Sequence, residues 1–536
     1  MECNVDYPLL MNVYSRSSRF RWVDCQLDAL KKCRSPTTLQ KALKNLPKTL
    51  YGTYDRILAA ISEDDRQDAL NLLQWLAFSV RTISLDEAVE VLATDPDAVG
   101  VPLFDPYRGL RDPRDILTIC SSLVSITPVV LLGYTESNGG DQSYDEERNL
   151  LRTVRNTTRF PHMATVKLAH FSVGEYLTSD YFREGNTGIL FYHFDKEIAN
   201  TFIAKTCVAY LLQFDTYCVT HDTEKTYPLF DYAAQHWTHH AQSDGDGRSE
   251  TLHRLIMQLL NPSDPMYTNW LVHAKKSIKP SPLYYSLLAG LKRVSLALLS
   301  TGSNVNMQGG AFGTPLQIAS FKGYTSIVQS LLEHGADVNA SEGPYGNALL
   351  GATFGGHDDI IQFLLEHGAD ANAQEEGFGW TPLSAASLRG ANAIVQSLMD
   401  HGADVNTQGG HYGTTLQAAS SKGHESIVIL LLKHRADVNA HGGIEGSALL
   451  AALSGGHDTI VQLLLEHGSD VNTQGGSHGN ALCEASFKGQ YAIVQLLLEH
   501  GADVDAHGGP HGSAHRRRLQ GLTLTSSDCC WRGERT

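Results

Sequence analysis

Two short stretches of the sequence carry residue types whose spacing could support chemistry. His236, His239 and His240 are spaced i, i+3 and i+4, so on a helix they would share one face, as metal-binding histidines do. No carboxylate or cysteine falls in the surrounding turn, and the H-E-x-x-H pattern is absent from the chain. We therefore expect these histidines to serve packing and solvent exposure, and we predict no metal site.

The second stretch, Gly-Gly-Ser-His-Gly at 475–479, fits the G-x-S-x-G pattern in which a serine nucleophile stands on a strand-to-helix turn. Equivalent glycine-rich strings at 309–313 and 409–413 lack the serine, so the string is interpreted as part of a repeated segment. A phosphate-binding loop would need G-x-x-x-x-G-K-[ST], and no Gly-Lys dipeptide occurs anywhere in the chain. We predict no enzymatic activity and no cofactor.

The unit that repeats is represented by residues 313–340, GTPLQIASFKGYTSIVQSLLEHGADVNA. It returns about every 33 residues, which marks a solenoid of stacked supersecondary units. The phrase that closes each unit, HGADVN or a close variant, begins at residues 334, 367, 401, 434, 467 and 500. The pattern resembles the ankyrin repeat, which implies helix pairs joined by fingers and a role in binding proteins. A degenerate opening unit at 282–308 precedes six full repeats that end near residue 506.

Each repeat is predicted to consist of a helix, a turn, a second helix and a glycine-rich finger. Thr314 can cap the first helix, and Pro315 suits its first turn because a missing N–H costs nothing there. Gly323 can adopt a positive φ and end that helix. The histidine of each HGAD phrase falls in the last turn of the second helix, where a donor suits the helix dipole, so we interpret it as a capping residue. Asp337 and Asn339 favour the turn hydrogen bonds that follow.

Ankyrin-repeat proteins bind partners through their finger tips and the exposed end of the first helix, and the matching positions here form two columns. The first column is mostly apolar, and the second is a broken row of cations. On an acidic protein, this combination would suit a partner with hydrophobic anchors and carboxylates. The alternative is that the phenylalanines pack beneath neighbouring fingers. The candidate partner-binding residues are Phe321, Lys322, Phe354, Leu388, Arg389, Lys422, Phe487 and Lys488.

Ahead of the repeats, the sequence predicts three helices. Residues 64–80 hold their apolar side chains mostly on one broad face. Ser84 and Glu87 form a capping box for the second helix, because serine accepts from one free N–H at the helix start and glutamate reaches back to another. The dipeptide Asp112-Pro113 starts the third helix.

Two strand candidates follow, at 126–132 and 165–170, and Ser172 with Glu175 would form a capping box for another helix. Three helices followed by a two-stranded wing predict a winged-helix domain over about 63–190. Winged helices often read DNA, but the third helix here carries acidic residues and few basic ones. We therefore expect nucleic acid not to be the partner.

Four phrases in this region resemble the segment that follows the nucleotide-binding core of fungal NACHT-ankyrin proteins, which are STAND-type signal-transducing NTPases. They are FRWVDCQLDALKKC, LPKTLYGTYDRIL, DPRDILTICSSL and VKLAHFSVGEYL, within a match over about 20–260. The resemblance implies a winged helix of the GPI inositol-deacylase type, without the NTPase core. It also implies that His170 matches a histidine that contacts the phosphate of bound ADP. The alternative for His170 is a buried structural role.

These observations predict a mostly α-helical chain in five parts. A helical remnant over 1–62 and the winged-helix domain over 63–190 come first, followed by a helical linker over 191–275. The ankyrin-repeat solenoid occupies 276–510. A frayed tail over 511–536 follows, where the repeat register is lost.

Charge and composition narrow the class of protein. The formal net charge of −16 argues against general binding to nucleic acid or to anionic membrane surfaces. The longest apolar run is far shorter than the ~20 residues that span a bilayer, and the chain does not start with a basic region followed by an apolar core. The nine cysteines show neither a disulfide framework nor a zinc spacing. These features predict the cytoplasm, with the nucleus as the alternative.

The sequence therefore predicts a non-enzymatic scaffold that binds a protein partner through its repeats, in a STAND-type receptor that lacks its P-loop. Two other classes of function stay open. One is the regulatory part of a nucleotide-dependent signalling switch, which would need a P-loop from a longer chain or a partner. The other is nucleic-acid binding by the winged helix. Neither a small-molecule substrate nor a membrane is expected among the partners.

Overall fold

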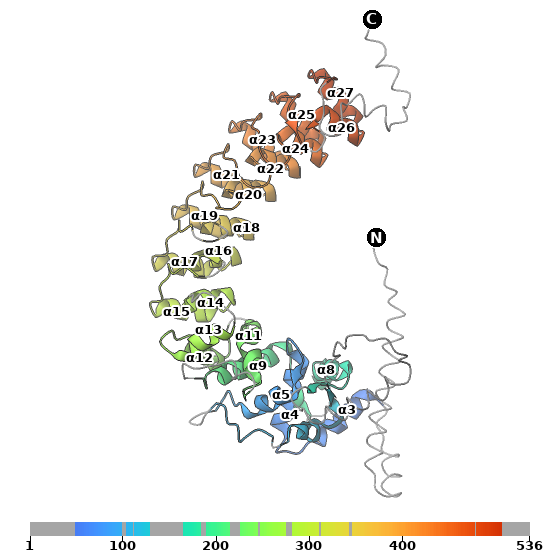
Figure 1. Cartoon of the computed structure of the whole chain (residues 1–536), viewed down its shortest axis with the longest axis vertical. Helices are drawn as coiled ribbons and strands as arrows, with labels where there is room; N and C mark the ends of the chain where they lie inside the picture. The colour runs from blue at the N-terminus through green and yellow to red at the C-terminus, as the bar shows by residue number, and fades with distance from the viewer. Residues whose placement is uncertain are drawn as a thin grey trace, which may run out of the picture. The chain divides into compact units, whose positions relative to one another are not determined.

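The computed structural model is mostly helical and divides into two compact units. The N-terminal unit comprises residues 1–282 and 289–294, and the C-terminal unit comprises residues 283–288 and 295–536. Figure 1 labels most of the helices of both units. The structure describes residues 49–98, 103–110, 112–128, 164–183, 189–214, 226–244, 247–274, 281–309, 312–341, 343, 346–476 and 479–505.

Several predicted features fall outside these described residues. They include most of the helical remnant at 1–62, the end of the strand candidate at 126–132, and the tail at 511–536. Within the described ranges, no helix is both long and apolar enough to cross a bilayer.

The N-terminal unit contains an antiparallel sheet of three short strands. These are β1 (Ile83–Ser84), β2 (Val124–Pro128) and β3 (Ala164–Leu168), and β3 lies between the other two. Val166, at the centre of β3, is buried and pairs with a residue of each neighbour. The strand candidates at 126–132 and 165–170 overlap β2 and β3. Strand β1 was not predicted, because two residues are too few to show alternation.

Three helices accompany this sheet: α4 (Arg66–Phe78), α5 (Leu85–Ala93) and α6 (Ile116–Cys120). The capping box predicted at the start of α5 is confirmed. The Ser84 hydroxyl accepts from the Glu87 N–H at 3.1 Å, and the Glu87 carboxylate accepts from the Ser84 N–H at 2.6 Å. The local sequence thus determines where this helix begins.

Two predicted helices differ in detail from the structure. A 3-10 turn, Pro113–Asp115, precedes α6, so the third predicted helix is not one continuous α-helix. Helix α8 (Phe171–Leu177) is capped by His170, whose Nδ1 atom accepts from the Ser172 N–H. The predicted capping box of Ser172 and Glu175 is therefore wrong, because the helix begins one residue before Ser172 and another side chain occupies the cap.

Helices α9 (Lys196–Leu211) and α11 (Leu229–Ala241) pack on α4 and α5 and bury large aromatic side chains. Trp75 and Tyr232 are fully buried, with ring centroids 5.1 Å apart. Burial of each such ring stabilises the unit by roughly 2–3 kcal/mol. The domain boundary at residue 190 stays a prediction, although α9 and α11 pack against elements that precede it. The other α-helices described here are α3 (Leu50–Ala59), α12 (Glu250–Leu259) and α13 (Pro265–His273).

The C-terminal unit is a row of helix pairs, which Figure 1 shows stacked one after another. Helices α14 (Pro282–Leu288) and α15 (Lys292–Ser300) come before the full repeats. The first helices of the full repeats are α16 (Pro315–Lys322), α18 (Ala348–Gly355), α20 (Pro382–Arg389), α22 (Thr415–Lys422), α24 (Ala448–Gly455) and α26 (Ala481–Lys488). The second helices are α17 (Thr325–Glu333), α19 (Asp358–Glu366), α21 (Asn392–Asp400), α23 (Glu425–Lys433), α25 (Asp458–Glu466) and α27 (Tyr491–Glu499).

The predicted helix ends of the repeats are confirmed. Thr314 caps α16 in a capping box with Gln317, and Pro315 occupies the first turn. Gly323 ends α16 with φ 76°, and the equivalent glycine after each later first helix has φ between 71° and 81°. At the end of α17, the Nδ1 atom of His334 donates to the carbonyl of Ser330 at 2.7 Å. The same bond forms at His367, His401, His467 and His500.

An asparagine ladder joins neighbouring repeats. Asn339 donates from Nδ2 to the carbonyl of Gly368 at 3.1 Å, and its Oδ1 accepts from the N–H of Asp370 at 2.7 Å. The equivalent asparagines of the other repeats make the same pair of bonds. The sequence predicted turn bonds here, and those form too, since Asp337 accepts from the Asn339 N–H. The contact between repeats was not foreseen.

Candidate partner-binding face

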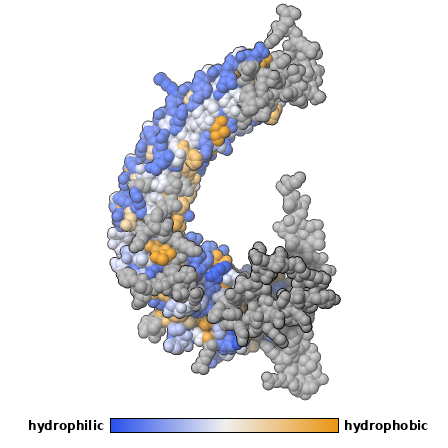
Figure 2. All heavy atoms as spheres, viewed as in Figure 1, coloured by the Kyte–Doolittle hydropathy of each residue, from blue (hydrophilic) through white to orange (hydrophobic). Residues whose placement is uncertain are grey.

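The first helices of the repeats lie on one side of the row, which we call the first-helix face. Their charged residues are four cations and one carboxylate, Glu484, which is buried and paired with Lys488. The second helices carry nine carboxylates and a single cation, Lys433. Figure 2 shows hydrophobic residues along the first-helix face and hydrophilic residues along the opposite side. The two sides of the array therefore differ in both hydropathy and charge.

The structure places the predicted apolar column on this face. Phe321, Phe354 and Leu388 are half-buried at the ends of their helices. Phe487, in the last repeat described, has 58% of its surface exposed. The column is thus partly covered in the first three repeats and more exposed in the last repeat described.

Aromatic residues of the fingers contact this column. The rings of Phe312 and Phe321 lie 6.0 Å apart, and those of Phe354 and Trp380 lie 5.9 Å apart. Trp380 in turn lies 6.5 Å from Tyr412. We call Phe312, Phe321, Phe354, Trp380 and Tyr412 the aromatic strip. A row of half-buried aromatic rings is the kind of surface that supplies anchors at protein interfaces.

The sequence analysis missed three members of the strip, Phe312, Trp380 and Tyr412. It also missed Phe378, which is 60% exposed and lies 4.3 Å from the His411 ring. The available signal was an aromatic residue immediately before the start of several repeats. The predicted alternative, in which the phenylalanines pack beneath fingers, is compatible with these contacts, since finger and helix rings share one surface.

The predicted cations divide into two groups. Arg389 donates to the carbonyl of Thr353 at 2.5 Å, in the repeat before its own. Lys488 donates to the carbonyls of Leu453 and Ser454 at 2.8 and 2.5 Å, again one repeat back. Both cations therefore satisfy carbonyls at the end of a first helix.

The other two cations bond no helix-end carbonyl in the part of the chain that the structure describes. Lys422 lies over the ring of Tyr412, with its Nζ atom 5.4 Å from the centroid. Lys322 is exposed and has no hydrogen-bond or ion-pair partner among the described residues. Among the described residues, these two ammonium groups have no carbonyl as hydrogen-bond partner, unlike Arg389 and Lys488.

Histidines replace the cations as carbonyl partners in the remaining repeats. His357 donates from Nε2 to the carbonyl of Phe321 at 3.0 Å. His424 and His457 make the equivalent bonds to Leu388 and Ser421. Ala391 and Gln490 stand where three other repeats have this histidine, and in those two repeats Arg389 and Lys488 bond carbonyls of the preceding repeat instead. The ends of the first helices are thus held by side chains of the next repeat.

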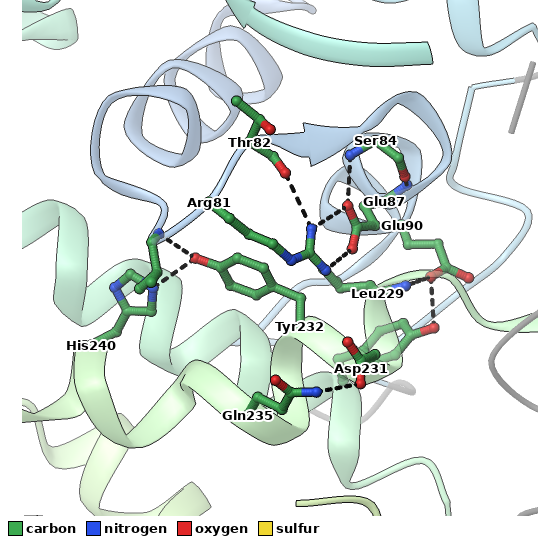
Figure 3. Close-up of polar contacts among 12 residues, drawn as sticks. Arg81, Thr82, Ser84, Glu87, Glu90, Leu229, Asp231, Tyr232, Gln235 and His240 are labelled. Atoms are coloured by element: carbon green, nitrogen blue, oxygen red, sulfur yellow. Dashed lines mark hydrogen bonds and ion pairs between the residues drawn. The ribbon is translucent and has the colours of Figure 1, made fainter. Parts of the chain in front are cut away.

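The N-terminal unit contains a separate polar cluster, shown in Figure 3. Arg81 makes two hydrogen bonds to Glu87, at 2.6 and 3.0 Å, and lies 5.0 Å from the centroid of Tyr232. The Tyr232 hydroxyl accepts from the Val80 N–H and is 2.8 Å from Nε2 of His240. Every polar contact in this cluster joins groups of the unit itself, which is the pattern of a structural network.

The three spaced histidines belong to this region. His240 is fully buried, and its Nδ1 atom lies 2.6 Å from Oδ1 of Asn200. Burial and the neighbouring histidines lower the pKa of His240 to about 3. The ring of His236 packs against Tyr232, with centroids 4.8 Å apart. In the described ranges, no three His, Cys, Asp or Glu side chains are grouped as metal ligands would be.

Glu90 is the carboxylate of this region with the most altered acidity. Its Oε2 atom accepts from the Tyr210 hydroxyl and from the Leu229 N–H at the start of α11, both at 2.7 Å. Burial raises the pKa of Glu90 to about 7, although both hydrogen bonds act in the opposite direction. Neutral pH is therefore close to the midpoint of its titration.

His170 and the G-x-S-x-G string occupy contrasting places. The Nδ1 atom of His170 is 2.7 Å from the Ser172 hydroxyl, which also bonds the Tyr54 hydroxyl at 2.8 Å. The predicted nucleotide role of His170 stays a prediction.

Ser477 lies outside the described residues, between strands β4 (Gln474–Gly475) and β5 (Gly479–Asn480) of an antiparallel hairpin. This hairpin corresponds to the finger of the other repeats.

Comparison with known proteins identifies the repeats. The family model for a single ankyrin repeat matches residues 313–342, and the model for ankyrin repeats in three copies matches 348–442 and 441–507. The chain therefore contains ankyrin repeats. The crystal structure of the human ASB11 ankyrin repeat domain covers 38% of this chain and 90% of its own, with 27% identity and a TM-score of 0.34.

A relative is known from the fungus Monascus ruber. The azaphilone pigments biosynthesis cluster protein L of that organism is 30% identical over 337 residues, which cover 58% of this chain and 64% of that protein. The chain thus spans less than two thirds of the length of this relative.

Proposed function

We propose that the chain is a non-enzymatic scaffold that binds a protein partner along the first-helix face of its ankyrin repeats. Ankyrin repeats support a role in protein interaction in general. The observation that carries the proposal is the segregation of residues between the two sides of the array. Aromatic rings and accessible cations lie on one side, and nearly all carboxylates of the helices lie on the other.

This segregation indicates which residues would contact the protein partner. The aromatic strip supplies hydrophobic anchors, and Lys322 with Lys422 supplies charge. Arg389 and Lys488 contribute less to binding, because their donors already hold helix-end carbonyls. Phe487 extends the apolar column to the last repeat described.

The test compares matched charge reversals on the two sides of the array. The intact chain, Lys322→Glu and the control Lys433→Glu are immobilised and exposed to extract of the source cells. We expect Lys322→Glu to lose most captured proteins, because it places a carboxylate on the binding face. Lys433→Glu should keep them. Equal capture by all three folded chains, checked by circular dichroism, would contradict the proposal.

We further propose that the N-terminal unit is a winged-helix segment of a P-loop-less STAND or NACHT-ankyrin receptor in the cytoplasm. The order α4, β1, α5, α6, β2, β3, with β3 in the middle of the sheet, supports the winged helix. The resemblance of the four phrases supports the receptor family. A titration with ADP tests the nucleotide role, and binding that disappears in His170→Asn would revive the signalling switch.

A further inference from the structure

Three neighbouring fingers of the array are joined near their tips by hydrogen bonds between their backbones. They are the fingers at 373–381, 407–414 and 440–447, which precede α20, α22 and α24. The N–H of Gly410 donates to the carbonyl of Phe378 at 2.7 Å, and the N–H of Ile444 donates to the carbonyl of His411 at 3.0 Å. We call Phe378, His411 and Ile444 the finger-tip ridge, which shares no residue with the aromatic strip.

The finger-tip ridge exposes two large apolar side chains. Phe378 has 60% of its surface exposed, and Ile444 has 68%. The ring of His411, on the finger bonded to both of the others, lies 4.3 Å from that of Phe378. Single exposed apolar residues are common at protein surfaces, but residues on fingers that are bonded to one another form one patch. The ridge is therefore a candidate interaction surface.

The backbone holds these side chains in place before any ligand binds. The Glu375 carboxylate accepts from the N–H groups of Gly377 and Phe378, both at 2.6 Å, which fixes the turn that carries Phe378. Gly443 has φ 62°, and a Cβ there would collide with the carbonyl of Tyr412, so the close approach of these two fingers requires glycine. A ligand would therefore lose little affinity to the ordering of the ridge.

The charged residues on these three fingers are all acidic. The three segments contain three glutamates and neither lysine nor arginine. Glu376 is exposed two residues before Phe378. Glu445 follows Ile444, and one of its carboxylate oxygens accepts from the Ser454 hydroxyl at 3.2 Å. The ridge thus combines apolar side chains with carboxylates, whereas the first-helix face combines them with cations, so a complementary ligand carries basic residues.

We infer that the finger-tip ridge binds a segment of another protein that combines large apolar side chains with lysine or arginine. This inference goes beyond the proposed function, because it assigns a second surface whose preference for charge is opposite to that of the first-helix face. An acidic segment is excluded from the ridge by like charge, which keeps the ligands of the two surfaces distinct.

The experiment uses the full chain and three fluorescent peptides of about 12 residues, long enough to cross three fingers. The first peptide consists of Leu, Lys and Gly. The second has Ser in place of every Leu, and the third has Glu in place of every Lys. Binding is measured by fluorescence anisotropy, and circular dichroism checks that each variant is folded.

Two double variants change the ridge, and each has a matched control. Phe378→Ser with Ile444→Ser removes the apolar side chains, and its control is Tyr491→Ser, because Tyr491 is 62% exposed on α27. Glu376→Gln with Glu445→Gln removes the charges. Its control is Glu466→Gln with Glu499→Gln, which removes two exposed carboxylates at the ends of second helices.

We expect the first peptide to bind at least about tenfold more tightly than the other two. Each ridge variant should weaken its binding by about tenfold, and neither control should change it. Equal weakening by ridge and control variants would indicate general attraction to an acidic protein and would overturn the inference, as would tighter binding of the Glu peptide. A dimer of the chain that dissociates in Ile444→Ser, measured by sedimentation, would assign the ridge to a second copy and overturn it too. Because Lys322 enters none of these comparisons, the proposed function is tested separately.

Discussion

Glu90 is the residue whose chemistry is most sensitive to conditions near neutral pH. Its carboxyl group is held between Tyr210 and the first N–H of α11, and its pKa is raised to about 7 by burial. The folded state therefore holds this proton more tightly than the unfolded chain does, where the pKa is 4.5. It follows that the contribution of Glu90 to stability is lost as the pH rises from about 4.5 through about 7.

We predict that Glu90→Gln removes this loss. The amide oxygen can still accept from Tyr210 and Leu229, but it carries no charge to bury. At pH 8 the variant should be more stable than the wild type by on the order of 3 kcal/mol, and at pH 4.5 the two should be similar. Urea unfolding followed by tryptophan fluorescence measures the difference at each pH.

The contribution of His240 to stability changes with pH in the opposite direction, and this determines how the two proteins must be compared. Its pKa is lowered to about 3, so its contribution is lost as the pH falls from 6.5 toward 3. The wild type and Glu90→Gln must therefore be compared at the same pH, where His240 contributes equally to both. A difference between them that does not grow from pH 4.5 to pH 8 would contradict the role given to Glu90.

Among the elements, the ends of the first helices depend on the next repeat. Arg389 donates to the carbonyl of Thr353, 36 residues earlier, and His357 donates to that of Phe321 over the same separation. Each full repeat after the first thus bonds a carbonyl at the end of the first helix of its predecessor. The helix pairs therefore gain stability from stacking beyond the burial of apolar surface.

We predict that Arg389→Ala destabilises the array, whereas Lys322→Ala does not. Loss of a charge-assisted bond to a helix-end carbonyl should cost about 1–2 kcal/mol. Lys322, at the equivalent position, has no such partner among the described residues, which makes it the matched control. Thermal unfolding by circular dichroism gives the comparison. Equal midpoints for the two variants would show that the Arg389 bond does not stabilise the array.

The same contacts show how far the sequence could predict this protein. The local sequence was enough to predict the helix starts at Thr314 and Ser84 and the helix end at Gly323, because the hydrogen-bond partners lie within a few residues. Period and composition sufficed for the ankyrin repeats. The role of Arg389 could not be predicted, because its acceptor lies in another repeat and depends on which repeats lack a histidine. The finger ring Tyr412 was missed although an aromatic residue precedes the start of several repeats, because its contact with Trp380 joins two fingers.

At the scale of the whole repeat array, charge is arranged in columns that run from repeat to repeat. The last helical residue of each second helix is exposed, and five of the six are carboxylates. Lys433 replaces the carboxylate in the fourth, between Asp400 and Glu466 of the adjacent repeats. Its positive charge therefore reduces the electrostatic repulsion among the carboxylates of the column. The full column is Glu333, Glu366, Asp400, Lys433, Glu466 and Glu499.

We predict that Lys433→Glu lowers the thermal midpoint of the array at low ionic strength and that salt restores it. The variant turns two attractions into two repulsions across distances of about 10 Å, which is the Debye length near 0.1 M salt. The deficit should be clear in about 10 mM NaCl and largely lost in about 0.5 M NaCl. Lys433→Gln, which removes the attraction without adding repulsion, should lie between the two. A deficit that is independent of salt would instead indicate lost packing of the lysine side chain and would remove the charge column as a determinant of stability.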